Sequence, residues 1–297
     1  LMVGLGSNDS LRGIFSTIFQ EHFSLTTTQL GLIVTASYIG NLVFLLVGGN
    51  LSTRFSKKRV LQVLILIWMA ALALFAFTSN YTVLLIGMAL ALGSSTLLNT
   101  TMNLITPLLF ATAPGFFVNF LFFTQEIGTS GSQYILGSHA DGFAFWQHTN
   151  LVLLILGAVA FVLLLFCNVP EEAAAPADAP AQKGGYDWRI IVPYVLVFGF
   201  YFIAEHGVMN WMVAYGVDGL GLPQASAAKY LSVFFGGMMI GRLCLSPLVD
   251  KLGALKSLAA FGGVSCVLYL IGSLGGAVTM PVWALSGLSF SLLYPTL

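Results

Sequence analysis

Charge is what this sequence has least of. Of its 297 residues, 7% are Asp, Glu, Lys or Arg, while 58% are hydrophobic. A soluble domain usually carries about a quarter charged residues, so these side chains are too few to cover a water-facing surface. The composition excludes an ordinary soluble enzyme, a nucleic-acid-binding protein and a disordered chain. The 11 basic and 11 acidic residues cancel, so no net field attracts a charged partner.

Several chemical signatures are missing as well. The three cysteines, Cys167, Cys244 and Cys266, lie in apolar runs without a CxxC or a metal-ligand spacing, so we expect small core residues. The chain has no HExxH, GxSxG or Walker pattern. We therefore expect neither an enzyme nor an ATP-driven pump, and no cofactor.

Long apolar runs fill most of the chain. A bilayer core of about 30 Å requires about 20 mostly apolar residues per helix. Ten segments satisfy this requirement, which predicts an all-α polytopic protein of the lipid bilayer. The expected spans are 1–22, 29–52, 60–78, 81–106, 115–138, 147–168, 190–215, 226–249, 255–274 and 280–297.

One connection is long and polar. Residues 169–189 are dominated by Pro, Ala and Gly, which is typical of a flexible linker. It separates an N-terminal bundle of six helices, residues 1–168, from a C-terminal bundle, residues 190–297. The first and last spans have no polar flank, so we expect a truncated chain whose second bundle ends in its fourth helix.

Basic residues are distributed unevenly among the loops. They occupy three loops that alternating spans place on one side, and the loops after the first, third, fifth, seventh and ninth spans have none. Cytoplasmic loops carry an excess of Lys and Arg, so we expect a cytoplasmic linker in a protein of the inner membrane. The basic loop residues are Arg54, Lys57, Lys58, Arg59, Lys183, Arg189, Lys251 and Lys256.

The two halves resemble each other when the chain is shifted by 197 residues. The shift places Leu51–Leu61, LSTRFSKKRVL, on Leu248–Leu258, LVDKLGALKSL, and it places Gly40 on Gly237. Six spans separate the copies, so both cross the membrane in the same direction. Parallel six-helix repeats are typical of two-bundle transporters with a substrate site at the midplane.

Residues Gly49–Arg59 read GNLSTRFSKKR and resemble the cytoplasmic signature of the major facilitator superfamily, which has Gly, then Asp-Arg, then Gly-Arg-Lys-Arg. Thr53 stands where the family has Asp, and Ser56 where it has Gly, whereas Asp250–Gly253 in the second copy keeps both. In the family this Asp helps to lock one bundle conformation. The resemblance therefore implies an altered latch in the N-terminal half.

A narrower resemblance leads to the fucose–proton symporter branch, which transports sugars. Residues 19–40, FQEHFSLTTTQLGLIVTASYIG, carry it together with Tyr201–Glu205 and Ile240-Gly241-Arg242. The branch's carboxylate in the first helix falls near Gly13, one turn from Asp9. Its acidic proton carrier in the fourth helix falls on Asn99. Asn cannot titrate, so the resemblance implies a Na⁺ site or uncoupled transport in preference to simple proton symport with that residue.

Ionisable side chains at membrane depth are costly and usually have a function or a partner. Asp9, Glu126, Glu205 and His206 are candidates for ion coupling. Asp9 and Arg12 share a helix face and form either a neutralised structural pair or a titrating carboxylate held by Arg12. Glu126 either takes up protons, binds sugar or pairs with Arg12. His206 either carries protons or has a structural role.

Uncharged polar side chains supply candidate substrate ligands. Their amides either bind a solute or hydrogen-bond between helices. The shift by 197 places Asn8 opposite Glu205, so both halves have polar groups at matching depth. Trp211 either stacks on a sugar or lies in the aromatic belt at the membrane surface. The candidate ligands are Asn8, Asn99, Asn103, Gln125, Asn210 and Trp211.

The basic loops also suggest a gate. Arg54, Lys58, Arg242 and Asp250 are the candidate gating residues, with Arg242 pairing with Asp250 or binding substrate.

The sequence favours a secondary transporter that moves a small polar solute by alternating access coupled to H⁺ or Na⁺, and the resemblance to the symporter branch implies that a sugar is the leading substrate class. A drug or metabolite exporter of the same fold is an alternative, although its cavity is usually larger and more apolar. A transport-inactive membrane receptor is a third, because the branch's acids are missing at Gly13 and Asn99.

Overall fold

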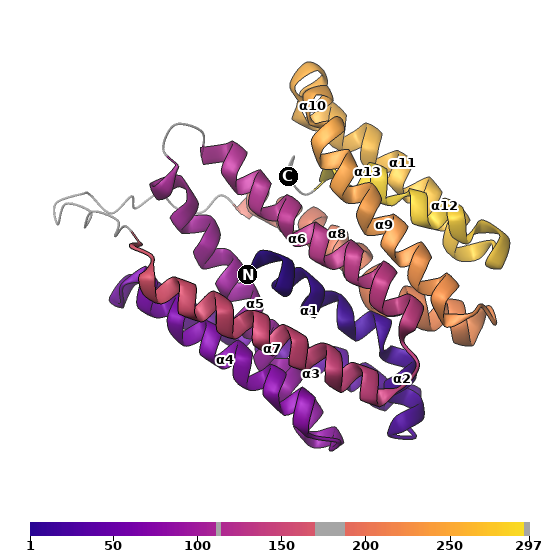
Figure 1. The fold of residues 1–297 in the computed structure, drawn as a ribbon. Helices are drawn as coiled ribbons and strands as arrows, with labels where there is room; N and C mark the ends of the chain where they lie inside the picture. The colour runs from indigo at the N-terminus through magenta and orange to yellow at the C-terminus, as the bar shows by residue number, and fades with distance from the viewer. Residues whose placement is uncertain (111–113, 170–187, 294–297) are drawn as a thin grey trace. The chain divides into compact units, whose positions relative to one another are not determined.

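The structure, a computed structural model, describes residues 1–110, 114–169 and 188–293, and every regular element in this part is helical (Figure 1). The side chains of some helical residues, including Arg54 and Asp250, lie outside the description. The elements are α1 (Met2–Ile14), α2 (Ser16–His22), α3 (Thr27–Arg54), α4 (Lys57–Phe77), α5 (Tyr81–Leu109), α6 (Pro114–His139), α7 (Phe143–Phe166), α8 (Trp188–Ala214), the π-helix η1 (Tyr215–Gly219), α9 (Gln224–Cys244), α10 (Ser246–Leu252), α11 (Ala254–Leu274), the 3₁₀ helix η2 (Ala277–Thr279), α12 (Met280–Leu285) and α13 (Gly287–Phe290).

Helices occupy each of the expected apolar segments, but three segments are broken. The breaks fall at Phe15, between α1 and α2, at Leu245 before α10, and at Ser286 before α13. Among the described residues, six helices are long and apolar enough to cross a membrane, namely α3, α4, α5, α7, α8 with η1, and α11. The count of ten spans therefore stays a prediction.

The chain forms two compact units. The first contains Leu1–Pro170 and Asn210–Ser232, and the second contains Glu171–Met209 and Val233–Leu297. The end of α8 and the start of α9 thus pack with the N-terminal helices. The division at the linker, with 1–168 and 190–297 as separate bundles, stays a prediction.

Aromatic side chains form the centre of the first unit. Phe15 and Phe19 pack edge-on against Trp146, with ring centroids 5.3 and 4.8 Å away. Phe75 on α4 lies 5.1 Å from the same indole ring. All four side chains are buried, and this cluster joins α1, α2, α4 and α7 where the first segment bends. Aromatic pairs in such geometries add stability beyond the area they bury.

Helices α1 and α6 approach each other closely because glycines line their interface. A Cβ atom at Gly6 would overlap the backbone carbonyl of Gln125, and one at Gly128 would overlap that of Val3. Hydroxyl groups then bridge the two helices, for example between Ser10 Oγ and Ser132 Oγ at 2.6 Å. Small residues that let helix backbones approach are the usual means of packing helices in lipid.

The same close approach recurs in both units. In the first unit, Gly40 of α3 lies against the backbone of Ala89 of α5. In the second unit, Gly237 of α9 lies against the start of α13, with Leu288 N 3.1 Å from a Cβ built on that glycine. The shift by 197 residues places Gly40 on Gly237 and Ala89 next to Gly287. This recurrence is what an internal repeat predicts.

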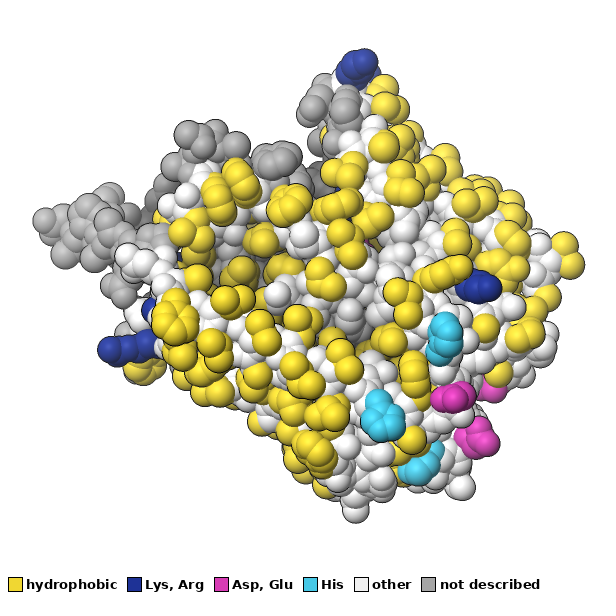
Figure 2. Space-filling model, in the orientation of Figure 1, with side chains coloured by type: hydrophobic (Ala, Val, Ile, Leu, Met, Phe, Trp, Pro, Cys, Tyr) yellow, Lys and Arg dark blue, Asp and Glu magenta, His cyan; other side chains and the backbone are white. Residues whose placement is uncertain are grey.

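Hydrophobic side chains cover much of the surface. Figure 2 shows them over α4 and α7, while charged side chains gather at a few places on the visible face. Cys167, Cys244 and Cys266 are exposed on this apolar surface, so the expectation that they lie in the core is wrong. Sequence cannot separate the two environments, because lipid-facing and core-facing positions are equally apolar.

The glycines of α6 provide a matched pair of substitutions. We expect Gly128→Ala to lower the free energy of unfolding by about 1–3 kcal/mol, because the new methyl group overlaps the α1 backbone. Gly131→Ala should be neutral or slightly stabilising, because a Cβ there meets nothing within 4 Å. Thermal unfolding of the detergent-purified variants measures both effects. Equal stability of the two variants would contradict the close contact between α1 and α6.

Candidate functional site

A polar stripe runs along α5 in the first unit. Ser95, Asn99 and Asn103 are four residues apart and therefore share one helix face. Asn103 Nδ2 donates to Asn99 Oδ1 at 3.0 Å, and Asn99 Nδ2 donates to Gln125 Oε1 on α6 at 2.7 Å. Asn99 and Asn103 therefore lie on one face of α5 and contact each other. The stripe gives an apolar bundle a continuous row of donors and acceptors.

Asp9 lies at one end of this stripe. Ser95 Oγ is 3.1 Å from Asp9 Oδ1 and 3.3 Å from Oδ2, and Asn8 Nδ2 donates to Oδ1 at 3.3 Å. Asn8 is buried and Asp9 is half-buried. These hydrogen bonds partly replace the water that the carboxyl group loses on burial.

Arg12 is directed to different helices. Its side chain is 4% exposed, and Nε donates to Asn210 Oδ1 on α8 at 3.4 Å. Asn210 Nδ2 in turn donates to the Tyr38 hydroxyl on α3 at 3.1 Å. Three helices of the first unit therefore meet at one buried amide. The sequence offers Asp9 or Glu126 as the partner of Arg12, and the structure joins its Nε to Asn210.

Helix α6 carries two more buried polar side chains on one face. Glu126 is 8% exposed and follows Gln125 directly. Gln133, two turns further along, is fully buried, and neither of its amide atoms has a hydrogen-bond partner among the described residues. A buried amide of this kind is destabilising and requires an explanation. Glu126 and Gln133 mark the face of α6 that carries polar groups into the unit.

Two of the expected coupling residues belong to the second unit. Glu205 is buried there, 8% exposed. His206 is half-buried, and its Nδ1 lies 3.1 Å from the carbonyl oxygen of Phe202, one turn earlier on α8. The carboxyl group and the imidazole thus occupy adjacent positions on α8. Their assignment to ion coupling stays a prediction.

Trp211 lies in the first unit, half-buried against its hydrophobic core. Of the alternatives for this residue, the packing favours an interior position over the membrane surface.

The structure describes the side chains of two of the four expected gating residues, Lys58 and Arg242. Lys58 Nζ donates to the carbonyl oxygens of Leu165 at 3.0 Å and Cys167 at 2.8 Å, at the C-terminal end of α7. A cation is favourable there because the last carbonyls of a helix carry partial negative charge. Arg242 is half-buried on α9, while the side chains of Arg54 and Asp250 lie outside the described residues.

Hydroxyl and amide groups link the N-terminal helices to the start of α9. Ser130 and Ser232 exchange hydrogen bonds, each hydroxyl donating to the other's backbone carbonyl, at 2.9 and 2.8 Å. Gln224 Nε2 donates to Ile14 O at 2.6 Å, and Thr17 Oγ1 donates to Gln224 Oε1 at 3.0 Å. These contacts close the first unit at the end where α2 lies.

A polar cavity of about 660 Å³ adjoins these contacts. Three carboxylate residues line it, namely Glu21, Asp141 and Asp218. Within the described ranges no three His, Cys, Asp or Glu side chains are grouped so as to hold a metal ion. The cavity therefore has an acidic lining, but its described side chains do not form a cluster that could hold a metal ion.

The sequence did not identify Tyr38, Ser95 and Gln133. Ser95 was detectable in principle, because it lies one turn before Asn99 on the same face. The Tyr38 hydroxyl accepts a hydrogen bond from Asn210 because α3 and α8 come together there, which no local pattern reveals. Gln133 was detectable as an amide in an otherwise small and apolar stretch of α6.

The same substitution at two positions of α6 should have opposite effects. We expect Gln133→Leu to raise the free energy of unfolding by about 1–3 kcal/mol, because a buried amide without partners is removed at similar volume. Gln125→Leu should lower it by about 1 kcal/mol, because Asn99 loses its acceptor. Thermal unfolding in detergent measures both. A stability loss in Gln133→Leu would mean that this amide has a partner in the folded protein.

Comparison with known proteins identifies relatives over the whole chain. The L-fucose-proton symporter of Escherichia coli strain K12 is 24% identical over 97% of this chain and 75% of its own length. A glucose/galactose transporter of Brucella abortus is 27% identical over 93% of this chain and 71% of the relative. The hexuronate transporter of Bacillus subtilis is 28% identical over 72% of this chain and 53% of the relative.

Solved structures share the fold. A crystal structure of a Major Facilitator Superfamily transporter, FucP, in the outward conformation aligns with a TM-score of 0.66 and 19% identity, covering 99% of this chain and 80% of that one. A D-xylose-proton symporter aligns with a TM-score of 0.73 and 15% identity over 99% and 78%. The model of the Major Facilitator Superfamily matches residues 1–297. The chain therefore belongs to the Major Facilitator Superfamily and is a multi-pass membrane protein.

Proposed function

We propose that this protein is a secondary transporter that moves a small polar solute of the sugar class by alternating access, coupled to H⁺ or Na⁺. The α5 stripe is the observation that carries the proposal, because inside an apolar bundle it places a hydroxyl group against α1 and an amide against α6. The names of the relatives, a fucose–proton symporter and a glucose/galactose transporter among them, support the sugar class.

The chemistry of the stripe suits a polyhydroxylated solute. Each sugar hydroxyl both donates and accepts, and so does each amide of Asn99, Asn103 and Gln125. Asn103 Oδ1 has no hydrogen-bond partner among the described residues, so the stripe retains an acceptor at that end. The indole of Trp211 would supply the apolar face on which a sugar ring can stack. An exporter of large apolar molecules would have little use for this row of amides.

Coupling requires a group that binds the ion in one conformation and releases it in the other. Asp9 accepts a hydrogen bond from Ser95, the first residue of the stripe, so a change in its charge acts at one end of this row of polar side chains. Glu126 adjoins Gln125 on α6. Glu205 and His206 are two further ionisable side chains, adjacent to each other on α8. We propose Asp9 and Glu126 as the principal coupling carboxylates, with Glu205 and His206 as further candidates.

The carboxylates can be tested by replacing them with amides, which keep the shape and one acceptor oxygen but cannot exchange a proton. In proteoliposomes with an imposed H⁺ or Na⁺ gradient, we expect Asp9→Asn, Glu126→Gln or Glu205→Gln to abolish accumulation of labelled sugar. Transport should then stop when the internal and external concentrations are equal. Counterflow exchange should partly survive, because it requires binding and rocking without net ion movement.

The control for this experiment is Glu21→Gln, which changes a carboxylate of the acidic cavity instead of the stripe. It should leave accumulation intact. Full accumulation with an unchanged pH profile in all three amide variants would remove these carboxylates from the coupling mechanism. Loss of counterflow together with accumulation would indicate a binding role.

We further propose that the linker and the basic loops face the cytoplasm. Lys183 lies outside the described residues, so Lys256, exposed near the start of α11, is the better reporter. In the full-length protein with its cysteines removed, Lys256→Cys should resist an impermeant thiol reagent applied to intact cells. Val278→Cys, 89% exposed between α11 and α12, should be labelled. Labelling of Lys256→Cys alone would reverse the orientation.

A further inference from the structure

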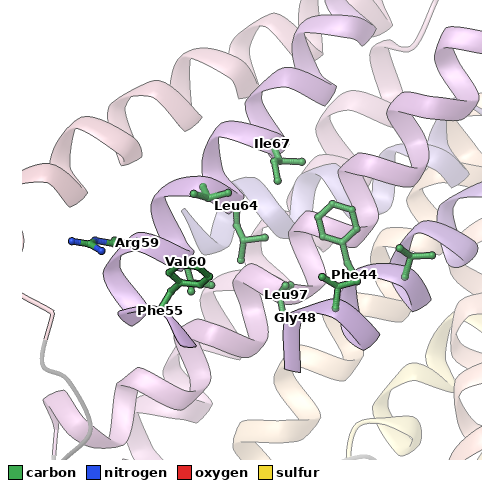
Figure 3. Close-up of a pocket in the computed structure, with 11 residues that line it drawn as sticks. Phe44, Gly48, Phe55, Arg59, Val60, Leu64, Ile67 and Leu97 are labelled. Atoms are coloured by element: carbon green, nitrogen blue, oxygen red, sulfur yellow. The ribbon is translucent and has the colours of Figure 1, made fainter. Parts of the chain in front are cut away.

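An apolar groove of about 500 Å³ runs between α3 and α4 on the surface of the first unit (Figure 3). Both helices pack extensively on α5, but they hardly touch each other, so a gap remains between them. Leu97 of α5 forms the floor of this gap. The walls are Val43, Phe44, Val47 and Gly48 of α3 and Val60, Val63, Leu64 and Ile67 of α4.

The groove is open to the surroundings of the helices. Val43, Val47 and Val63 are each about half exposed, with 51%, 52% and 52% of their surface accessible. The lining is almost entirely apolar, so water would be a poor occupant. Both α3 and α4 are long and apolar enough to span a membrane, so the medium beside them is lipid.

One end of the groove is positively charged. Phe55 and Arg59 close it, and Arg59 is exposed with its guanidinium directed away from the apolar walls. Lys57, Lys58 and Arg59 occupy the first turn of α4, which contains no acidic residue. The N-terminus of a helix also carries partial positive charge. An anion is therefore favoured at this end, and Lys58 is already engaged by the carbonyl groups of α7.

The arrangement matches one kind of amphiphile. Arg59 lies in the first turn of α4, at the expected membrane surface, and Ile67 lies about 12 Å further along the helix axis, towards the membrane interior. An occupant must therefore place an anionic group at the surface and an apolar chain beneath it. We propose that the groove binds an anionic phospholipid of the surrounding leaflet, with the phosphate on Arg59 and an acyl chain between α3 and α4.

Charge complementarity decides between lipid classes. A guanidinium can hold a phosphate by two parallel hydrogen bonds, and a basic side chain near an anionic surface contributes about 1 kcal/mol. A zwitterionic headgroup carries a compensating cation that would meet Arg59 and a first turn of α4 that contains no acidic residue. The site therefore selects phosphatidylglycerol over phosphatidylcholine.

The test is lipid retention by the full-length protein, released from nanodiscs of mixed phosphatidylglycerol and phosphatidylcholine and measured by native mass spectrometry. Wild-type protein should retain phosphatidylglycerol preferentially. Arg59→Gln should reduce this retention about fivefold, whereas Arg59→Lys should reduce it less, because the charge is kept. Lys251→Gln, at the corresponding loop of the second unit, should have no effect.

A second variant tests the groove independently of charge. Val63→Trp fills the gap and should reduce phosphatidylglycerol retention to the level of Arg59→Gln, and Val43→Trp on the opposite wall replaces it if Val63→Trp does not fold. Val152→Trp, on the exposed face of α7, controls for added bulk. Equal retention of both lipids by the wild type, or unchanged retention in Arg59→Gln and the tryptophan variant, would overturn the proposal. A changed oligomeric state with unchanged retention would instead assign the groove to a contact between copies.

Discussion

The cost of placing polar groups away from water is the constraint on which the rest of this structure depends. Among the described residues, nearly every polar side chain of α1 points to an acceptor or donor on another helix or on its own previous turn. Gly6 and Gly128 allow this by bringing backbones close enough for serine and threonine hydroxyls to reach across. The close contact between α1 and α6 thus both packs the two helices and provides hydrogen-bond partners for their polar side chains.

That constraint also explains where the candidate site forms. Amides and a carboxylate can only be kept at membrane depth if several helices supply partners, so the polar residues of α1, α5 and α6 converge. The aromatic cluster around Trp146 lies where α1 meets α2 and fixes the bend that directs α1 towards α5. The broken helix formed by α1 and α2 therefore carries both the stabilising aromatic cluster, at its bend, and the polar side chains of the candidate site, on α1.

Sequence predicted the helical segments well, because each is a long apolar run. The spacing of Asn99 and Asn103 in the sequence is also enough to place them on one helix face, since four residues are about one helical turn. Sequence could not predict that Arg12 reaches Asn210 or that Tyr38 completes this contact, because such pairs join residues far apart in the chain. The placement of the cysteines failed for a related reason: hydropathy does not distinguish a neighbour helix from a lipid chain. The break at Phe15 was also missed, because no proline or polar run marks it.

The serine pair between α6 and α9 has a consequence for how this contact responds to salt. Ser130 and Ser232 hold the two segments by neutral hydrogen bonds, each worth about 0.5–1.5 kcal/mol net. Breaking such a contact needs no counter-ions, so its strength should barely respond to ionic strength, unlike a contact made of paired charges. The free-energy cost of separating α6 from the start of α9 should therefore be nearly the same in dilute and in saline surroundings.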